Sequence, residues 1–132
     1  MARTNIKAII QSDIHNIWKI VLAVENYDKW RSDVSKTEII NEKKFIEYTK
    51  DGYSTTFTVT VIKPLNRWEF DMENTNMKGH WVGIFTSKDD KTEIDFTEQV
   101  TAKKFFMKPF VKSYLKKQQA RFVVDLKKVL EK

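Results

Sequence analysis

The stretch AIIQSDIHNIWKIVLAVENYDKW, residues 8–30, contains the transition that decides the fold. We expect Ser12 to cap a helix, with Asp13 in its first turn, where the helix dipole favours an anion. Apolar residues then recur at spacings of three and four, as on one face of an amphipathic helix; they are Ile14, Ile17, Trp18, Val21 and Leu22. ENYDKW, residues 25–30, predicts a second, shorter helix or turn that ends at a tryptophan.

Strands surround this helical stretch. RTNIKAII, residues 3–10, predicts a strand before it, and KTEII and KKFIEYT predict two strands after it, joined by a turn at Asn41-Glu42. Asp51-Gly52 between alternating runs is typical of a two-residue hairpin loop. Such a loop would pair Lys50 with Tyr53. One face of this hairpin would then carry Ile46, Tyr48, Phe57, Val59 and Val61.

Two further segments alternate between apolar and polar residues. NRWEFDME, residues 66–73, places Trp68, Phe70 and Met72 on one face. The last predicted hairpin turns around residues 88–91, and Glu98 shares the inward parity of its apolar neighbours. A four-residue loop would place Trp81 opposite Glu98, whereas a three-residue loop would place His80 there. The sequence leaves this register open.

Residues 105–131 predict one long helix. Its expected apolar side comprises Phe110, Val111, Tyr114, Leu115, Gln118, Phe122, Leu126, Val129 and Leu130. Lys108, Lys112 and Lys116 step by four along another ridge. Residues 103–132 hold ten basic and two acidic side chains, so the basic charge of the chain belongs to this segment.

The composition restricts the chemistry of the protein. The chain has 132 residues and no cysteine, which excludes disulfides, a cysteine nucleophile and thiolate metal sites. No glycine-rich phosphate loop or calcium-loop spacing is present, and we expect neither a metal nor a cofactor. Without a secretory leader pattern or a membrane-length apolar run, we expect one soluble cytoplasmic domain over residues 1–132.

Taken together, the sequence resembles the START-like, or SRPBCC, superfamily, and within it the single domains of the polyketide cyclase/dehydrase type. The residues that carry the resemblance are 8–30, IKPLNRWEF at 62–70 and FVKSYLKKQQARFVVDLKKVLE at 110–131. Ser12-Asp13 stands where such domains commonly have Ala-Pro, and no proline flanks Trp30. The resemblance implies an α+β helix-grip fold, in which a curved antiparallel sheet of six or seven strands holds the C-terminal helix. It also implies a hydrophobic cavity between them.

We expect aromatic side chains and one carboxylate to form this cavity. The expected lining residues are Trp30, Tyr48, Phe57, Trp68, Trp81, Glu98, Phe110 and Tyr114. Aromatic rings supply apolar area, while hydroxyls and Glu98 would orient a polar group of the ligand. An unpaired buried carboxylate is costly, so Glu98 should have a partner, such as Arg31, Arg67 or a tyrosine, or a raised pKa.

Three functions fit this pattern, and we favour the first, a non-catalytic carrier or sensor of a small hydrophobic or amphipathic molecule. The second is a cyclase- or dehydratase-like enzyme that uses Glu98, His80 or Tyr48 as acid or base. The third is an interaction module in which Lys108, Lys112 and Lys116 make weak contact with an anionic membrane. We do not expect nucleic-acid binding, because the aromatics of the last helix are assigned to the core.

Overall fold

The computed structural model describes residues 1–131. The elements follow one another as β1 (Ala2–Ile10), α1 (Ile14–Leu22), η1 (Val24–Lys29), β2 (Lys36–Asn41), β3 (Lys44–Tyr48), β4 (Ser54–Lys63), β5 (Arg67–Glu73), β6 (Met77–Lys88), β7 (Lys91–Ala102), η2 (Phe105–Met107) and α2 (Lys108–Leu130). The two η elements are short 3-10 helices.

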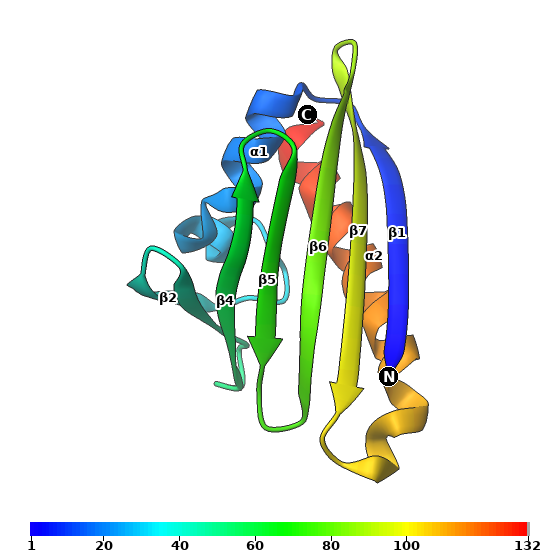
Figure 1. Ribbon diagram of the computed structural model, residues 1–132. Coiled ribbons are helices and arrows are strands. Elements are labelled where there is room, and N and C mark those ends of the chain that lie inside the picture. The colour runs from blue at the N-terminus through cyan, green and yellow to red at the C-terminus, as the bar shows by residue number, and fades with distance from the viewer. Residues whose placement is uncertain (132) are drawn as a thin grey trace.

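The seven strands form one antiparallel sheet in the order β1-β7-β6-β5-β4-β3-β2. The long helix α2 lies across one face of this sheet and packs mainly against β1 and β7 (Figure 1). Helices α1 and η1 lie at one end of the same face, where they connect the two edge strands. This is the α+β helix-grip arrangement that the sequence predicts.

The first helix begins one residue later than expected. Asp13, not Ser12, is the N-cap, because its carboxylate accepts hydrogen bonds from the backbone N–H groups of His15 and Asn16. A carboxylate at this position satisfies two free donors and also interacts favourably with the helix dipole. Helix α1 buries Ile17 and Val21, as its periodicity predicts.

The predicted register between β3 and β4 is wrong by one residue. The structure pairs Tyr48 with Ser54 and Phe45 with Phe57. The turn between Thr49 and Tyr53 has three residues, with Gly52 at a φ of 82°. An odd loop length reverses the facing of one whole strand. Tyr48 and Ile46 therefore lie on the opposite face from Phe57.

The register between β6 and β7, which the sequence left open, places Trp81 opposite Glu98 and Phe85 opposite Ile94. A tight turn at Asp89-Asp90 joins the strands, and Asp89 has a φ of 61°. His80 is paired with Gln99, so its side chain points to the outer face of the sheet.

Helix α2 buries a different set of residues from the one predicted. Val111, Leu115 and Leu126 are buried as expected, but Val123 is also buried. Phe110 and Tyr114 were assigned to the core, and this is wrong for both: they are 69% and 48% exposed. In the first turns of α2 the sheet covers only the side that carries Val111 and Leu115, which pack with Val100 and Ala102 of β7, and Phe110 and Tyr114 lie away from that side.

Candidate functional site

A cavity of about 380 Å³ lies between the sheet, α2 and the segment that follows η1. Its lining includes the aromatic side chains Tyr27, Phe45, Phe57, Trp68, Phe70, Trp81, Phe96 and Phe122. A volume of this size suits a small organic molecule, and the apolar walls would bury most of its surface.

The aromatic wall is rigid because its rings contact one another. Phe70 stacks on Trp81 with ring centroids 4.7 Å apart, and Phe45 stacks on Phe57 at 4.9 Å. Phe57 meets Phe70 edge to face at 5.2 Å, which connects the two stacked pairs. These rings come from four neighbouring strands, β3 to β6, whose inward positions follow the two-residue period of the sheet.

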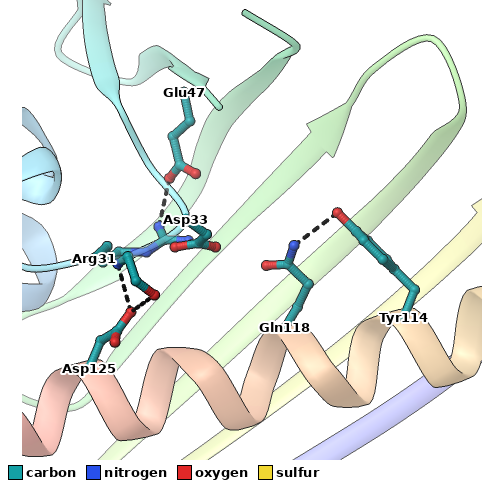
Figure 2. Close-up of polar contacts among 7 residues, drawn as sticks. Arg31, Asp33, Glu47, Tyr114, Gln118 and Asp125 are labelled. Atoms are coloured by element: carbon teal, nitrogen blue, oxygen red, sulfur yellow. Dashed lines mark hydrogen bonds and ion pairs between the residues drawn. The ribbon is translucent and has the colours of Figure 1, made fainter. Parts of the chain in front are cut away.

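A cluster of charged groups occupies the side of the cavity next to η1. The Arg31 guanidinium donates to Glu47 at 3.0 Å and to Asp33 at 2.9 Å, and all three side chains are largely buried (Figure 2). Burial opposes the charge on Arg31, but the two carboxylates raise its pKa above the ordinary value. Burial also disfavours the charged form of Glu47 and so raises its pKa, while the charge of Arg31 opposes that rise. The cluster thus fixes residues 31–33 against β3.

Glu98 projects into the cavity without a partner. It is 8% exposed, and within residues 1–131 no hydrogen bond or ion pair joins its carboxylate to another side chain. Burial raises the pKa of Glu98 to about 7, although the charge of Arg31 works in the opposite direction. Near neutral pH this carboxyl can therefore donate or accept a proton. Arg67, which the sequence offered as a partner, instead donates to Glu69 on the outer face.

The cavity opens between α2 and the turns at one end of the sheet. Tyr114 and Gln118 rise from α2 toward this opening, and the Gln118 amide donates to the Tyr114 hydroxyl at 2.9 Å (Figure 2). On the sheet side, the hydroxyl of Tyr53 lies 3.2 Å from that of Thr75. The opening is therefore polar, while the interior is aromatic.

A second polar contact closes the far side of the cavity. Asp125 of α2 is buried and accepts hydrogen bonds from both the backbone N–H and the hydroxyl of Ser32, at 2.8 and 2.9 Å (Figure 2). This contact ties the loop after η1 to the helix and so sets the distance between two walls of the cavity.

The structure brings together six of the eight expected lining residues and separates the other two. The six that line the cavity are Tyr48, Phe57, Trp68, Trp81, Glu98 and Tyr114.

Trp30 and Phe110 lie outside the lining, and Tyr48 belongs to it only at the border. Trp30 packs edge to face between Tyr27 and Phe122, behind the cavity wall, and its buried indole N–H has no partner within residues 1–131. Tyr48 borders the cavity, but its hydroxyl donates to Glu38 on the opposite face of β3, as the corrected register requires.

His80, one of the candidate acid–base residues, also lies outside the cavity. Its ring nitrogens lie 2.6 Å from Asp71 and 2.8 Å from Glu69 on the outer face of the sheet. Burial lowers the pKa of His80, but these two carboxylates outweigh it and leave the pKa raised. These two contacts give His80 a structural role on the outer face of the sheet.

Sequence reasoning missed several cavity residues. Phe70 and Phe96 have the same parity as Trp68 and Glu98, so the alternation already identified them as inward-facing. Phe45 and Glu47 were missed because they depend on the β3–β4 register. The contact between Ser32 and Asp125 joins residues that are far apart in the chain, and no local pattern predicts it.

Residues 1–131 lack two further kinds of feature, a membrane-spanning helix and a cluster of metal ligands. No helix there is long and apolar enough to cross a membrane. In the same residues, no group of three or more His, Asp or Glu side chains is placed to hold a metal ion.

Comparison with solved structures shows close similarity in fold at low sequence identity. A START superfamily protein from Mycobacterium smegmatis matches with a TM-score of 0.88 and 14% identity, over 99% of this chain and 98% of that one. A conserved protein from Geobacillus kaustophilus matches with a TM-score of 0.82 and 16% identity, over 96% of this chain and 93% of that one. The Zhui aromatase/cyclase from Streptomyces matches with a TM-score of 0.84 and 10% identity, over 98% of this chain and 93% of that one. No curated protein matches the sequence.

The family model described as polyketide cyclase / dehydrase and lipid transport matches residues 1–131. This match covers nearly the whole chain and agrees with the helix-grip architecture. The chain belongs to the polyketide cyclase/dehydrase and lipid transport family.

Proposed function

We propose that residues 1–132 form one domain that binds a small hydrophobic or amphipathic molecule in the cavity, as a carrier or sensor. The observation that carries this proposal is the aromatic cavity of about 380 Å³ with the buried carboxyl group of Glu98 inside it, which has no partner within residues 1–131. We place this activity in the cytoplasm, where a chain without cysteine is insensitive to reducing conditions.

The chemistry of the lining supports an amphipathic ligand. Trp68, Phe70 and Trp81 offer flat apolar surface that is already desolvated and rigid, so ordering these side chains costs little on binding. Arg31 already has two carboxylate partners, which leaves Glu98 as the polar group free to orient a ligand. A ligand with an apolar body and one hydroxyl, carbonyl or amino group would satisfy both features.

Glu98 also favours a second candidate, a cyclase- or dehydratase-like enzyme acting on a hydrophobic substrate in the same cavity. A carboxyl group with a pKa of about 7 is half protonated near neutral pH. It can then protonate a carbonyl or hydroxyl oxygen, or accept a proton from carbon, in a site that excludes water. Of the other two candidates, His80 lies on the outer face and the Tyr48 hydroxyl is already bound to Glu38, so Glu98 would act alone.

The first experiment is native mass spectrometry of the purified full chain, followed by solvent extraction and identification of any released molecule. A stoichiometric adduct that is lost on extraction would support an occupied cavity and give the class of ligand. The variant Trp81→Ala removes part of the wall and should reduce the adduct. Retention of the adduct in Trp81→Ala would contradict binding in this cavity.

The Glu98→Gln variant separates the two functions once a ligand is known. A carrier should keep its ligand with a modest change in affinity, whereas an enzyme should lose turnover and keep substrate binding. Glu93→Gln is the matched control, because Glu93 lies on the same strand with the opposite parity.

A further inference from the structure

The end of the molecule near the cavity opening carries four exposed aromatic side chains. Phe105 is 80% exposed, Phe106 62%, Phe110 69% and Tyr114 48%. Phe105 and Phe106 form η2, and Phe110 and Tyr114 lie one helical turn apart at the start of α2. Exposure of so many rings at one end is costly unless another surface covers them.

This end is also positively charged. Residues 99–124 contain six lysines and one arginine but no aspartate or glutamate. Lys117 follows Tyr114 by three residues and Phe110 by seven, so it shares their exposed helix face, and Arg121 lies one turn further on. In the sequence, Lys104 directly precedes Phe105, and Lys108 lies between Phe106 and Phe110. We call Lys104, Phe105, Phe106, Lys108, Phe110, Tyr114, Lys117 and Arg121 the basic aromatic surface.

The basic aromatic surface adjoins the cavity opening. Phe110, Tyr114 and Gln118 are spaced by four residues on α2, and both Tyr114 and Gln118 line the cavity. In Figure 1 the η2 segment and the start of α2 project past the β5–β6 turn, so this end can contact a flat surface without obstruction by the sheet.

We propose that the basic aromatic surface docks on an anionic lipid bilayer and thereby brings the cavity opening to the membrane. Phenylalanine rings gain free energy by entering the boundary between headgroups and acyl chains, and lysines gain it from the negative surface potential. The occupant is a bilayer because three of the four rings are phenylalanines, which carry no polar group and gain free energy by leaving water. Phe105 and Phe106 are also perpendicular to each other at 82° and offer no parallel stacking platform.

The basic aromatic surface differs from the membrane contact that the sequence suggested, which consisted of Lys108, Lys112 and Lys116. Lys112 and Lys116 are two and six residues from Phe110, so they lie on another flank of α2 from the exposed rings. Lys108 is also two residues from Phe110, but it is the first residue of α2 and directly follows η2, so it stays next to the segment that carries Phe105 and Phe106. The rings, not the lysine spacing, identify the membrane-facing side.

The test is co-sedimentation of the full chain with vesicles of phosphatidylcholine alone and of phosphatidylcholine with about 30% phosphatidylglycerol. We expect binding only to the anionic vesicles, and weaker binding as salt is raised. The triple variant Phe105→Ser, Phe106→Ser, Phe110→Ser should weaken binding at least about tenfold. The matched control changes three exposed isoleucines elsewhere, Ile39→Ser, Ile40→Ser and Ile62→Ser, and should bind like the wild type.

Charge is tested separately. Lys104→Gln, Lys108→Gln and Lys117→Gln together should abolish the preference for anionic vesicles, whereas Lys43→Gln, Lys44→Gln and Lys63→Gln should not. The proposal is wrong if the wild type ignores anionic vesicles at low salt, or if both isoleucine and phenylalanine variants lose binding equally. It is also wrong if the phenylalanine variant alters only self-association or binding to a single-stranded polynucleotide. None of these outcomes depends on the identity of a cavity ligand.

Discussion

Trp81 on β6 and Glu98 on β7 lie directly opposite each other, and both side chains face the cavity. Residues opposed in an antiparallel pair point to the same side of the sheet, so the indole ring and the carboxyl group share one wall. The aromatic surroundings keep water from Glu98, and this desolvation is the largest cause of its raised pKa.

The Glu98→Gln variant should become more stable relative to the wild type as pH rises. The pKa of Glu98 is about 7 in the folded protein, above the value of 4.5 expected without burial. The cost of the ionised form is therefore absent at low pH, grows between pH 4.5 and 7, and is constant above. Urea denaturation should show the difference in unfolding free energy increasing by about 2 kcal/mol from pH 5 to pH 8. Glu93→Gln should show no such trend, and parallel pH profiles for the two variants would refute this account of Glu98.

Gly83→Ala should displace the Trp81 ring. A Cβ atom at position 83 would lie 2.6 Å from Cζ3 of Trp81, which is held in its stack with Phe70. The ring would have to move into the cavity, at a cost of about 1–3 kcal/mol in unfolding free energy. Thermal unfolding and near-ultraviolet circular dichroism would measure the two effects.

Gly52→Asn is the control for that substitution. Nothing lies within 4 Å of a Cβ at position 52, and asparagine tolerates the positive φ of 82° there. It should cost about 1 kcal/mol or less. Equal losses in the two variants would show that glycine replacement itself, and not the Trp81 contact, is responsible.

Arg31→Met should destabilise the protein strongly near neutral pH. The change leaves the buried carboxylates of Asp33 and Glu47 without their shared cation, and such losses cost about 3–5 kcal/mol. The loss should shrink as pH falls, because burial raises the pKa of Glu47 and its protonation removes one uncompensated charge. Chemical denaturation at two pH values checks this.

The control for Arg31 is Arg67→Met. Arg67 is more exposed and pairs with Glu69 at the surface, so its loss should cost about 1 kcal/mol or less. If Arg31→Met is no more destabilising than Arg67→Met, the buried cluster does not hold the cavity wall in place.

Asp125→Ala should loosen the loop after η1. Ser32 would lose the acceptor for both its backbone N–H and its hydroxyl, and unfolding should cost about 1–3 kcal/mol less. Amide hydrogen exchange should speed up at Ser32. Glu131→Ala, which removes the acceptor for the Gln11 N–H, should speed exchange at Gln11 and leave Ser32 protected. Unchanged exchange at Ser32 in Asp125→Ala would contradict the tether.

The sequence predicts the fold well because its elements are strongly periodic. The spacing in residues 14–22 and the alternation in residues 66–73 each follow from one buried face, and the structure has both. The predictions fail where one residue changes the outcome. The three-residue turn at Lys50–Gly52 reverses the facing of Tyr48, and a local pattern does not fix the length of that turn.

The candidate site is less predictable because its polar contacts join distant segments. Arg31 meets Glu47, and Ser32 meets Asp125, only after the loop, sheet and helix have assembled. Phe110 fits the apolar side of a helix by spacing alone, but periodicity does not show that the sheet covers only the side of α2 that carries Val111 and Leu115.

The sheet order has a consequence for how the chain assembles during synthesis. Strands β2 to β7 pair with their neighbours in sequence, but β1 pairs only with β7, from Ala2 opposite Val100 to Ile10 opposite Thr92. During synthesis β1 therefore leaves the ribosome well before β7, and it must wait for its partner until the five strands between them have been made. Such long-range closure is slow compared with hairpin formation. Until β7 emerges, β1 is an open edge with Ile6 and Ile10 uncovered, and this is the interval in which a nascent chain is most exposed to misassembly.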